Sequence, residues 1–392
     1  MKKNSSFFLT GKFIMLFALC IVYSSVSLAQ DTKTKNTKKK KFKFKPDINL
    51  EFEARTTYDD NILKYSEKYL DRFMNREDEG RFQIKTDDDV ISRPSLKITA
   101  SQKLIKNFNT TLQFSMNRSF YINNGIKSWS FFDLSLEHYF HKKGYFSLSY
   151  NYIPNFYIRH YRDDDYVTFV GYVPESFKPM SFAKENYSFN TQYVFLKNTG
   201  IRLTLDYIRY FYNVHYIEYD SNDFSYEIRI LQPLSKKLRM QAAYSFTKSY
   251  AKGFDEAHET RETSNDADAS FFDNDFALGL RFNLPSFLKM THSLWFDGSY
   301  GKRSFTSPKY VEFDQLHAGR IDYNYRLALQ YRFKINKALN ASIFYNYFGR
   351  RTSSRSELNK EFISLEKDYN QNQIGFSLIY NYKLNYGKKK KQ

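Results

Sequence analysis

Cysteine is almost absent from this sequence of 392 residues, which contains one, Cys20. It lies inside an apolar stretch near the N-terminus, and the long chain that follows has no thiol. This absence excludes disulfides, cysteine nucleophiles and cysteine–metal sites from the chain after that stretch. We do not expect a lipid on Cys20 itself, because Leu19 stands where lipoprotein processing would need a small residue.

Long hydrophobic runs are also missing. After residue 30 no apolar stretch approaches the roughly 20 residues that a transmembrane helix needs, and the mean hydropathy of the chain is −0.64. These values argue against membrane-spanning helices, but they do not exclude membrane-spanning strands. A strand with one apolar face and one polar face averages out as polar even when its apolar face lies in lipid.

The start of the sequence has the pattern of a secretory signal peptide. Lysines precede an apolar stretch, FIMLFALCIV (13–22), and SLA (27–29) offers small residues for cleavage. We therefore predict that the protein is exported. Residues 1–29 would be the signal peptide, and residues 30–47 would form a basic periplasmic segment at the start of the mature protein.

Positive charge is plentiful but unevenly placed. Of the formal charge of +18, residues 31–47 carry +6 and residues 388–392 carry +4, whereas the long stretch between them is nearly balanced. Basic ends on an exported chain do not indicate a nucleic-acid partner, and we predict none. We expect the segment 31–45 to be available to periplasmic or envelope protein partners, and residues 387–392 to form a basic C-terminal tail.

The stretch IDYNYRLALQYRF (321–333) alternates between two kinds of residue along its whole length. Large apolar and aromatic residues occupy its odd positions, and mostly polar residues occupy its even positions. This period of two predicts an extended strand, although ordinary strands have only about 5–6 residues. At about 3.3 Å per residue and a tilt of about 45°, this strand would cross about 30 Å, the hydrocarbon thickness of a membrane.

The same alternation recurs along the chain and predicts 14 strands. Their expected ranges are 48–56, 94–104, 110–121, 130–140, 145–153, 186–196, 201–211, 224–231, 238–247, 274–284, 289–300, 320–333, 338–348 and 372–385.

The connections between these stretches alternate between short and long. Short ones such as HKKG (141–144) contain lysine, and long ones such as 57–89 are rich in Asp and Glu. A soluble β-sandwich also alternates, but its connections need not sort into one short end and one long end. We therefore predict an all-β fold over 48–386. It would be a closed antiparallel up-and-down transmembrane β-barrel of about 14 strands, with short periplasmic turns and long extracellular loops.

In this pattern the chain resembles the bacterial outer-membrane β-barrel proteins of the porin-like class, although it matches no subfamily motif. The resemblance implies location in the bacterial outer membrane and contact with its lipid and lipopolysaccharide. Many such barrels end on a terminal aromatic residue. This chain departs from that pattern, because its last aromatic residue, Tyr386, is followed by GKKKKQ.

The polar faces of the predicted strands carry charges of both signs, which would face the lumen of the barrel. The lumen-facing candidates are Arg202, Asp206, Glu227, Arg229, Arg239, Arg281, Asp322, Arg326 and Arg332. A barrel of 14 strands lies between small barrels filled by side chains and wide aqueous channels. We therefore expect either a narrow pore or a pore into which a long loop folds, such as 57–89 or 153–185.

This pattern predicts a pore or channel for the diffusion of small polar solutes through a mixed-charge lumen, with no cofactor. The alternative is a non-enzymatic barrel that anchors or forms part of an envelope or secretion complex. Single-channel conductance would distinguish the two, because a barrel that serves only as an anchor would be silent.

A few residues are of types that occur in catalytic or metal-binding sites. Asp59, Asp60 and Asn61 are weak candidates for a divalent ion, although Asp and Asn also favour plain turns, and we favour the turn. His292 and Ser293 are adjacent and would lie on opposite faces of a strand, which disfavours a catalytic pair. Acids and histidines in 160–166 and 255–262 could serve a barrel hydrolase. We predict that the protein is not an enzyme.

Overall fold

The computed structural model describes residues 45–384, apart from the side chains of Lys106 and Lys197. Its strands are β1 (Asp47–Asp59), β2 (Asp89–Lys103), β3 (Asn109–Tyr121), β4 (Trp129–His141), β5 (Gly144–Arg162), β6 (Phe177–Val194), β7 (Gly200–Tyr212), β8 (Ser221–Pro233), β9 (Leu238–Ala251), β10 (Phe271–Phe287), β11 (Met290–Phe305), β12 (Arg320–Lys334), β13 (Leu339–Ser354) and β14 (Tyr369–Leu384). Its helices are α2 (Glu67–Met74), α3 (Asp164–Val170), α4 (Glu357–Lys367), and the 3-10 turns η1 (Ile105–Asn107), η2 (Gly125–Lys127), η3 (Pro174–Ser176), η4 (Leu196–Asn198) and η5 (Ile217–Tyr219).

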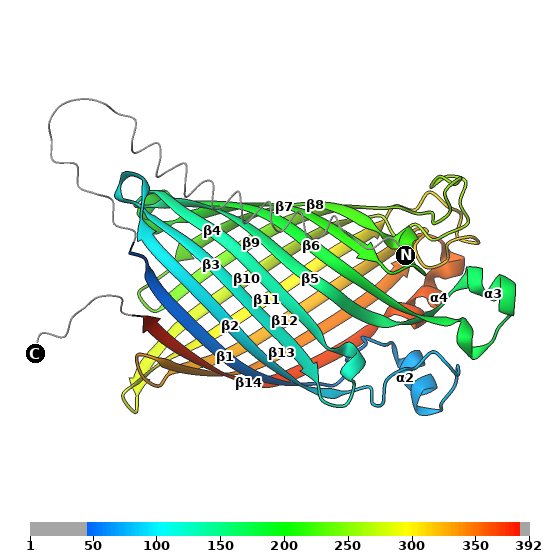
Figure 1. The fold of residues 1–392 in the computed structure, drawn as a ribbon, viewed down its shortest axis with the longest axis horizontal. Coiled ribbons are helices and arrows are strands. Elements are labelled where there is room, and N and C mark those ends of the chain that lie inside the picture. The colour runs from blue at the N-terminus through cyan, green and yellow to red at the C-terminus, as the bar shows by residue number, and fades with distance from the viewer. Residues whose placement is uncertain (1–44, 385–392) are drawn as a thin grey trace, which may run out of the picture.

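The 14 strands form one closed barrel in which each strand pairs with its neighbours in sequence (Figure 1). The barrel closes between the first and last strands, where β1 and β14 pair antiparallel from Ile48↔Leu384 to Asp59↔Gln373. Closure leaves no strand edge without a partner, which is the condition for a sheet to be stable in lipid. The predicted closed antiparallel barrel of about 14 strands is confirmed.

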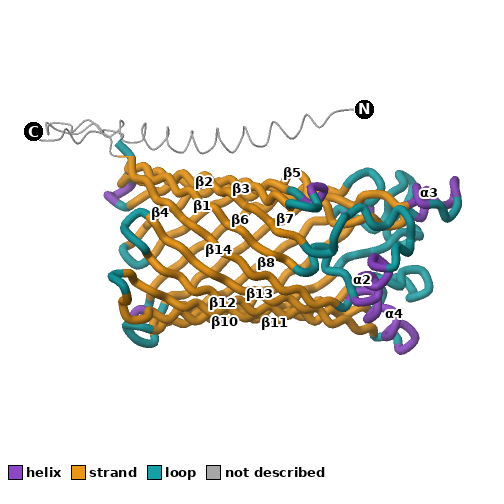
Figure 2. The backbone as a smooth tube through the Cα atoms, turned by 90° about the horizontal axis from the view of Figure 1, so that it is seen from below, coloured by secondary structure: helices purple, strands orange, loops and turns teal. Residues whose placement is uncertain are grey.

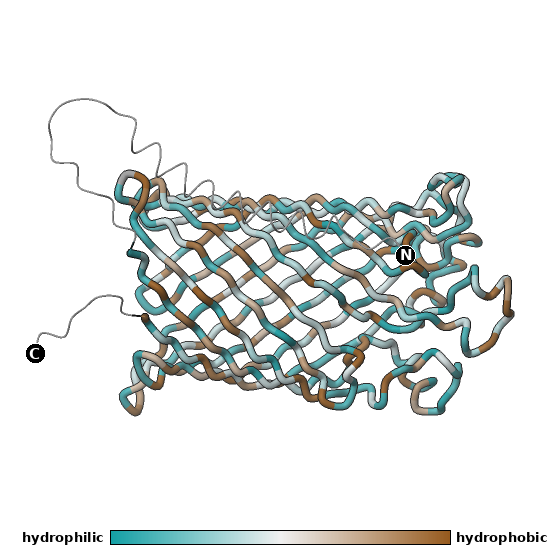
Figure 3. The backbone as a smooth tube through the Cα atoms, viewed as in Figure 1, coloured by the Kyte–Doolittle hydropathy of each residue, from teal (hydrophilic) through white to brown (hydrophobic). Residues whose placement is uncertain are grey.

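The two faces of the wall have opposite chemistry. Large apolar side chains are exposed on the outside, as with Leu203, Leu205 and Leu327, which are 43%, 55% and 47% exposed. Their neighbours in sequence point inward and are mainly polar. Hydropathy therefore alternates along the wall strands (Figure 3). This inverts the usual arrangement of a globular protein and follows from the period of two in the sequence.

The connections sort into two ends, which we call the short-turn end and the loop end. At the short-turn end they are only a few residues long, as between β4 and β5 or β10 and β11, and the described chain begins and ends there. At the loop end lie α2, α3 and α4 with most of the longer connections (Figure 2). Among the helices of residues 45–384, none has both the length and the apolarity to cross a membrane.

Several strands are longer at the loop end than the apolar pattern predicted. The hairpin of β5 and β6 was expected to end near residue 153 and to resume near residue 186, but its pairing continues to Arg162 and Phe177. The apolar face stops where lipid would stop, whereas backbone pairing continues beyond it. β2 also begins earlier, at Asp89, and its ladder with β3 is interrupted around Pro94, which has no N–H to donate.

Some predictions fall outside the described residues. These are the signal peptide (1–29), nearly all of the basic segment (30–47) and of the partner segment (31–45), the C-terminal tail (387–392), and the departure at Tyr386. They stay predictions.

Candidate functional site

The inner wall of the barrel carries the nine predicted lumen residues. The strand register places each of them on the face opposite the exposed apolar side chains. Asp206 accepts a hydrogen bond from Ser188 Oγ, which comes from the neighbouring strand. Asp322 accepts two hydrogen bonds of 2.6 Å from the Arg320 guanidinium and is 2% exposed. A role of these residues in conduction stays a prediction.

Arginines meet on this inner wall in like-charged pairs. Arg202 lies directly opposite Arg229 in the ladder between β7 and β8, and Arg239 lies directly opposite Arg281 in the ladder between β9 and β10. Among residues 45–384, only one of these four has a carboxylate partner: Arg229 donates two bonds of 2.8 Å to Glu227. Like charges directly opposite each other destabilise a sheet unless something else compensates them.

Trp295 of β11 provides part of that compensation. The Arg281 and Arg332 guanidinium carbons lie 4.0 and 3.4 Å from the centroid of the Trp295 ring, within the range of cation–π attraction. The remaining predicted cation, Arg326, lies more loosely over Phe348, at 5.6 Å. The result is a group of arginines on adjoining strands, held in place by aromatic and amide groups more than by acids.

The first long connection, residues 60–88, crosses part of the loop end. Its apolar residues Ile62, Leu63 and Tyr65 are buried and pack with Tyr157 of β5, which lies four places from β1 around the barrel. Arg159 of β5 donates a hydrogen bond to the carbonyl of Leu63. One of the two connections that we expected could fold inward therefore lies over the mouth.

The start of this connection is held by the last strand. Asp59 accepts hydrogen bonds of 2.8 Å from Gln371 and Gln373, and Asp60 accepts two of 2.7 Å from Asn372. Asn61 donates to the carbonyl of Tyr65 at 2.9 Å and accepts from its N–H at 2.8 Å. The two carboxylates thus face protein donors, as in the favoured interpretation as a turn. Binding of a divalent ion there stays untested.

A cavity of about 760 Å³, which we call the chamber, lies at the loop end. Its lining comes from the 60–88 connection, the loop end of β5, the connections 213–220, 252–270 and 306–319, and the ends of β12, β13 and α4. Charges of both signs line it. The cations are Lys64, Lys127, Arg159, Arg162, Arg320, Arg350 and Lys367, and the carboxylates are Asp163, Asp164, Asp165, Glu218, Asp255, Asp266, Glu312 and Asp314.

Lys127 is buried at the edge of the chamber. It is 4% exposed, and its Nζ donates to the carbonyls of Tyr157 at 2.9 Å and Ile158 at 3.3 Å. Burial, with repulsion from Arg159 and Lys64, lowers the pKa of Lys127 to about 7. This ammonium therefore changes charge in the physiological range, losing its proton as the pH rises through neutrality.

The carboxylates of the chamber are crowded. Oxygens of Asp165, Asp255 and Asp266 lie within 4.8 Å of one another, a spacing that could hold a metal ion. Burial and mutual repulsion raise the pKa of all three above the ordinary value for aspartate. A second group with ligand atoms equally close, Glu256, His258 and Glu259, lies in the same connection and is mostly exposed.

His292 and Ser293 do not form a catalytic pair, as expected from their adjacent positions in one strand. His292 faces outward, where its Nδ1 is bonded to the Tyr331 hydroxyl at 2.7 Å, whereas the Ser293 hydroxyl accepts from Trp295 on the inner face. An Asp–His contact does occur in the chamber: His215 Nδ1 lies 2.8 Å from Asp163 Oδ2.

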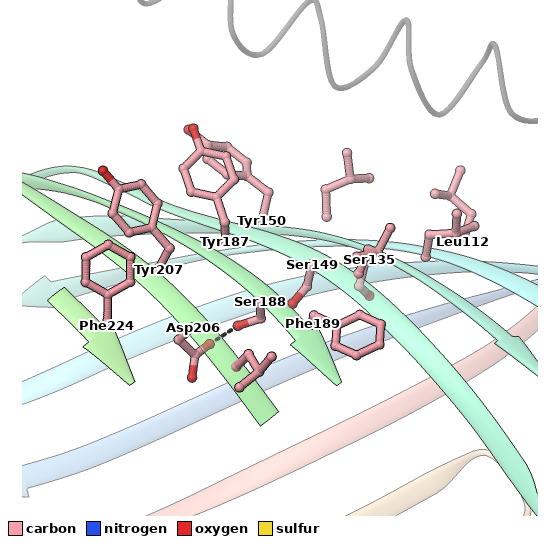
Figure 4. A pocket seen from close by; sticks show the side chains of 14 residues that line it. Leu112, Ser135, Ser149, Tyr150, Tyr187, Ser188, Phe189, Asp206, Tyr207 and Phe224 are labelled. Carbon is pink, nitrogen blue, oxygen red and sulfur yellow. Dashed lines mark hydrogen bonds between the residues drawn. The ribbon is translucent and has the colours of Figure 1, made fainter. Parts of the chain in front are cut away.

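A second concavity, of about 460 Å³, lies on the barrel wall and is lined mainly by apolar side chains of β3 to β8. Tyr150, Tyr187, Tyr207 and Phe224 form a row across its edge, with ring centroids 5.1, 6.3 and 5.0 Å apart (Figure 4). The register places this row on the same face as the exposed leucines. It belongs to the outer surface and not to a site for polar solutes.

The sequence pattern does not predict the residues that define the chamber, among them Arg159, Glu218 and Lys367. The alternation predicts that the strand of β5 ends at residue 153, which leaves Arg159 in a connection, whereas β5 continues to Arg162. Lys367 ends α4, a helix that no pattern in the sequence predicts. Clusters such as RHYRDDD (159–165) signalled charge at this end, but nothing local showed which distant groups they would meet.

No family model matches this chain, and no curated protein sequence matches it. Many solved structures have a similar arrangement of strands. They include a bacterial polysaccharide outer membrane secretin (8% identical, TM-score 0.45, covering 86% of this chain and 98% of that one). They also include the outer membrane channel DcaP of Acinetobacter baumannii (11%, 0.42, 87% and 99%) and OmpT of Vibrio cholerae (9%, 0.41, 87% and 99%).

The fold is established by the chain's own strand pairing. A closed antiparallel barrel of 14 strands, apolar outside and polar inside, has the architecture of outer-membrane β-barrel proteins.

Proposed function

We propose that this protein is a channel of the bacterial outer membrane through which small polar solutes diffuse along a lumen of mixed charge. The observation that carries the proposal is the set of like-charged pairs on the inner wall, Arg202–Arg229 and Arg239–Arg281. A dry interior would make these pairs very costly, because buried charges need partners. Water and mobile anions in the lumen would offset the repulsion.

The outer face supports the location. Its exposed leucines and phenylalanines form a continuous apolar surface that would be unfavourable in water and is matched by acyl chains. The apolar concavity bordered by Tyr150, Tyr187 and Tyr207 fits the same environment (Figure 4). Lipid and lipopolysaccharide would therefore be the partners of this face.

Conductance in a planar lipid bilayer tests the channel. The native barrel should give steady current steps, and the double variant Arg281→Glu/Arg332→Glu should shift the preference from anions toward cations by several fold. The double variant Arg76→Glu/Arg355→Glu makes the same charge change at two exposed positions outside the strands and should leave selectivity unchanged. Heat-dependent gel migration would establish that each variant is folded. A folded native barrel that passes no current would contradict the proposal.

A barrel that anchors an envelope or secretion complex is the second candidate. The basic composition of 31–45 favours it, because these lysines could contact an acidic periplasmic partner. Deleting 31–45 should then remove a co-purifying protein while leaving the barrel folded. Unchanged co-purification, together with clear conductance, would reject this candidate.

A hydrolase is the third candidate, and one contact favours it. The Asp163–His215 pair and the three clustered aspartates line the same chamber, which groups acids with a potential base. Asp163 also has a structural role, because its Oδ1 accepts from the Tyr166 N–H at the start of α3. Incubation of the native barrel with peptides and with phospholipid, followed by mass spectrometry, would test it. Cleavage that His215→Gln abolishes would support catalysis, and recovery of both substrates intact would contradict it.

A further inference from the structure

The chamber is divided by charge. Four cations of its lining act electrostatically on Tyr161, namely Arg159, Lys367, Arg350 and Arg320. The groups that act on Tyr216 include three carboxyl groups, those of Asp163, Glu218 and Asp164. Tyr161 and Tyr216 therefore mark a basic part and an acidic part of one cavity. What the chamber can hold follows from the groups on each side.

The basic side surrounds Tyr161. Lys367 Nζ and the Arg159 guanidinium lie 5.6 and 5.7 Å from its ring centroid. Arg320 and Arg350 lie nearby but share the buried carboxylate of Asp322. Arg159 and Lys367, by contrast, form no ion pair with any residue between 45 and 384. Two enclosed cations without a counter-ion create a place for an anion.

Lys367 keeps its charge at neutral pH. Burial, with repulsion from the neighbouring arginines, lowers the pKa of Lys367 to about 8. A carboxylate placed beside it would restore a favourable environment for the ammonium and make charge-assisted hydrogen bonds with both cations.

The acidic side is centred on Glu218. Burial, with repulsion from Asp266, Asp255 and Asp165, raises the pKa of Glu218 to about 8. None of these four carboxylates is paired with a cation in the part of the chain that the structure describes. With this pKa, Glu218 holds its proton at neutral pH as long as no cation is near. An ammonium group placed between the four carboxyl groups would relieve their repulsion and favour the charged form of Glu218.

A row of tyrosines joins the two sides. The ring centroids of Tyr161 and Tyr216 are 6.5 Å apart, and those of Tyr216 and Tyr219 are also 6.5 Å apart. The row is fixed, because Tyr216 is 5% exposed and its hydroxyl donates to the Tyr161 carbonyl at 2.7 Å. Two steps of 6.5 Å span at most twice that distance, which is the reach of a short extended peptide, since three residues span roughly 10 Å.

We propose that the chamber binds short peptides with free termini, with the terminal carboxylate at Arg159 and Lys367 and the terminal ammonium at Glu218 and the three aspartates. The tyrosine row provides the surface along which the peptide backbone lies. A cavity of about 760 Å³ falls within the range of small-ligand sites. This inference rests on the proposed channel, for which it names the solute class.

Titration calorimetry of the full chain in detergent micelles tests the peptide site. Trialanine should bind. Acetylation of its N-terminus or amidation of its C-terminus should each raise the dissociation constant about tenfold or more, since each removes a charge-assisted contact. Free alanine should also bind weakly, because it cannot reach both sides. Equal affinity for all four compounds, or no binding of trialanine, would overturn the proposal.

Two variants assign the ends. Lys367→Gln should weaken binding of trialanine but not of its amide, and Glu218→Gln should weaken binding of trialanine but not of its acetylated form. Lys360→Gln, on the exposed face of the same helix as Lys367, is the matched control. If a variant does not fold, the affinities of the native chain for the four compounds still test the proposal. The channel is judged separately by conductance, so steady current without peptide binding would reject only this inference.

Discussion

At the scale of single residues, the inner wall is tightly packed where Phe344, Gly375 and Arg55 meet. Phe344 is 4% exposed, and the Arg55 guanidinium lies 3.8 Å from its ring centroid. Gly375 is paired directly with Phe344 in the ladder of β13 and β14. A Cβ at position 375 would collide with the Phe344 ring and with the carbonyl oxygen of Thr56. Position 375 therefore requires glycine, because the Phe344 ring and the Thr56 carbonyl oxygen come too close for any side chain.

Gly375→Ala should lower the free energy of unfolding by about 1–3 kcal/mol, the usual cost of overpacking. Urea-driven unfolding in lipid vesicles would measure it. Gly125→Ala is the control, because a Cβ there meets nothing within 4 Å. If Gly375→Ala and the native barrel were equally stable, the wall could accept a Cβ at this position, which would contradict the close approach of Phe344.

The face of each strand residue could be predicted from the sequence, but partners across the closure could not. Asp59, Asp60 and Asn61 were recognised as a polar turn with some resemblance to an ion site. Their donors, Gln371, Asn372 and Gln373, lie more than 300 positions away in the chain. Only closure of β1 on β14 brings them together, and no local pattern contains that information.

At the scale of elements, α2 of the first connection and α4 of the last one are clamped to each other. Glu366 of α4 is 8% exposed and accepts hydrogen bonds from Lys68 Nζ and the Tyr69 hydroxyl, both on α2. Burial alone would raise the pKa of Glu366, but these two donors outweigh it and hold the pKa below the ordinary value of 4.5. The clamp fixes the connection that lies across the mouth.

Glu366→Gln should weaken the contact between α2 and α4 by about 1–3 kcal/mol, so that the first connection is no longer held in place. Because the pKa is depressed in the folded barrel, the stabilisation is present above pH 4.5 and is lost as the pH falls through the lower folded value. In the proposed channel, the current through the native chain should therefore flicker only in acid well below pH 4.5, whereas the current through Glu366→Gln should flicker at all pH values. Glu361→Gln, exposed on the same helix, should behave as the native chain. Identical records for all three would exclude the clamp.

The existence and order of the strands could be predicted because one face of each strand meets lipid. The loop ends of β5 and β6 and the helix α4 could not, because outside the membrane no apolar periodicity marks them. Arg159 and Lys367 lie in these unpredicted parts, which is why the chamber did not emerge from the sequence.

At the scale of the whole molecule, the barrel differs from a soluble globular protein in having its apolar surface on the outside. Fourteen strands close without an edge, and the charged residues of the wall face the interior or gather at the loop end. The near balance of charge along the body of the chain agrees with a lumen that carries both signs. Lipid outside and water inside are the central claim.

Chemical labelling at three successive positions of β12 tests that claim most directly. In a chain with Cys20→Ser, single substitutions Leu327→Cys, Ala328→Cys and Leu329→Cys would each be treated in lipid vesicles with a water-soluble maleimide. Ala328 faces inward between Leu327 and Leu329, which are 47% and 45% exposed on the outside. We expect rapid labelling at position 328 alone, with positions 327 and 329 reached only by a lipid-soluble maleimide. Equal labelling at all three positions, or labelling confined to 327 and 329, would contradict it.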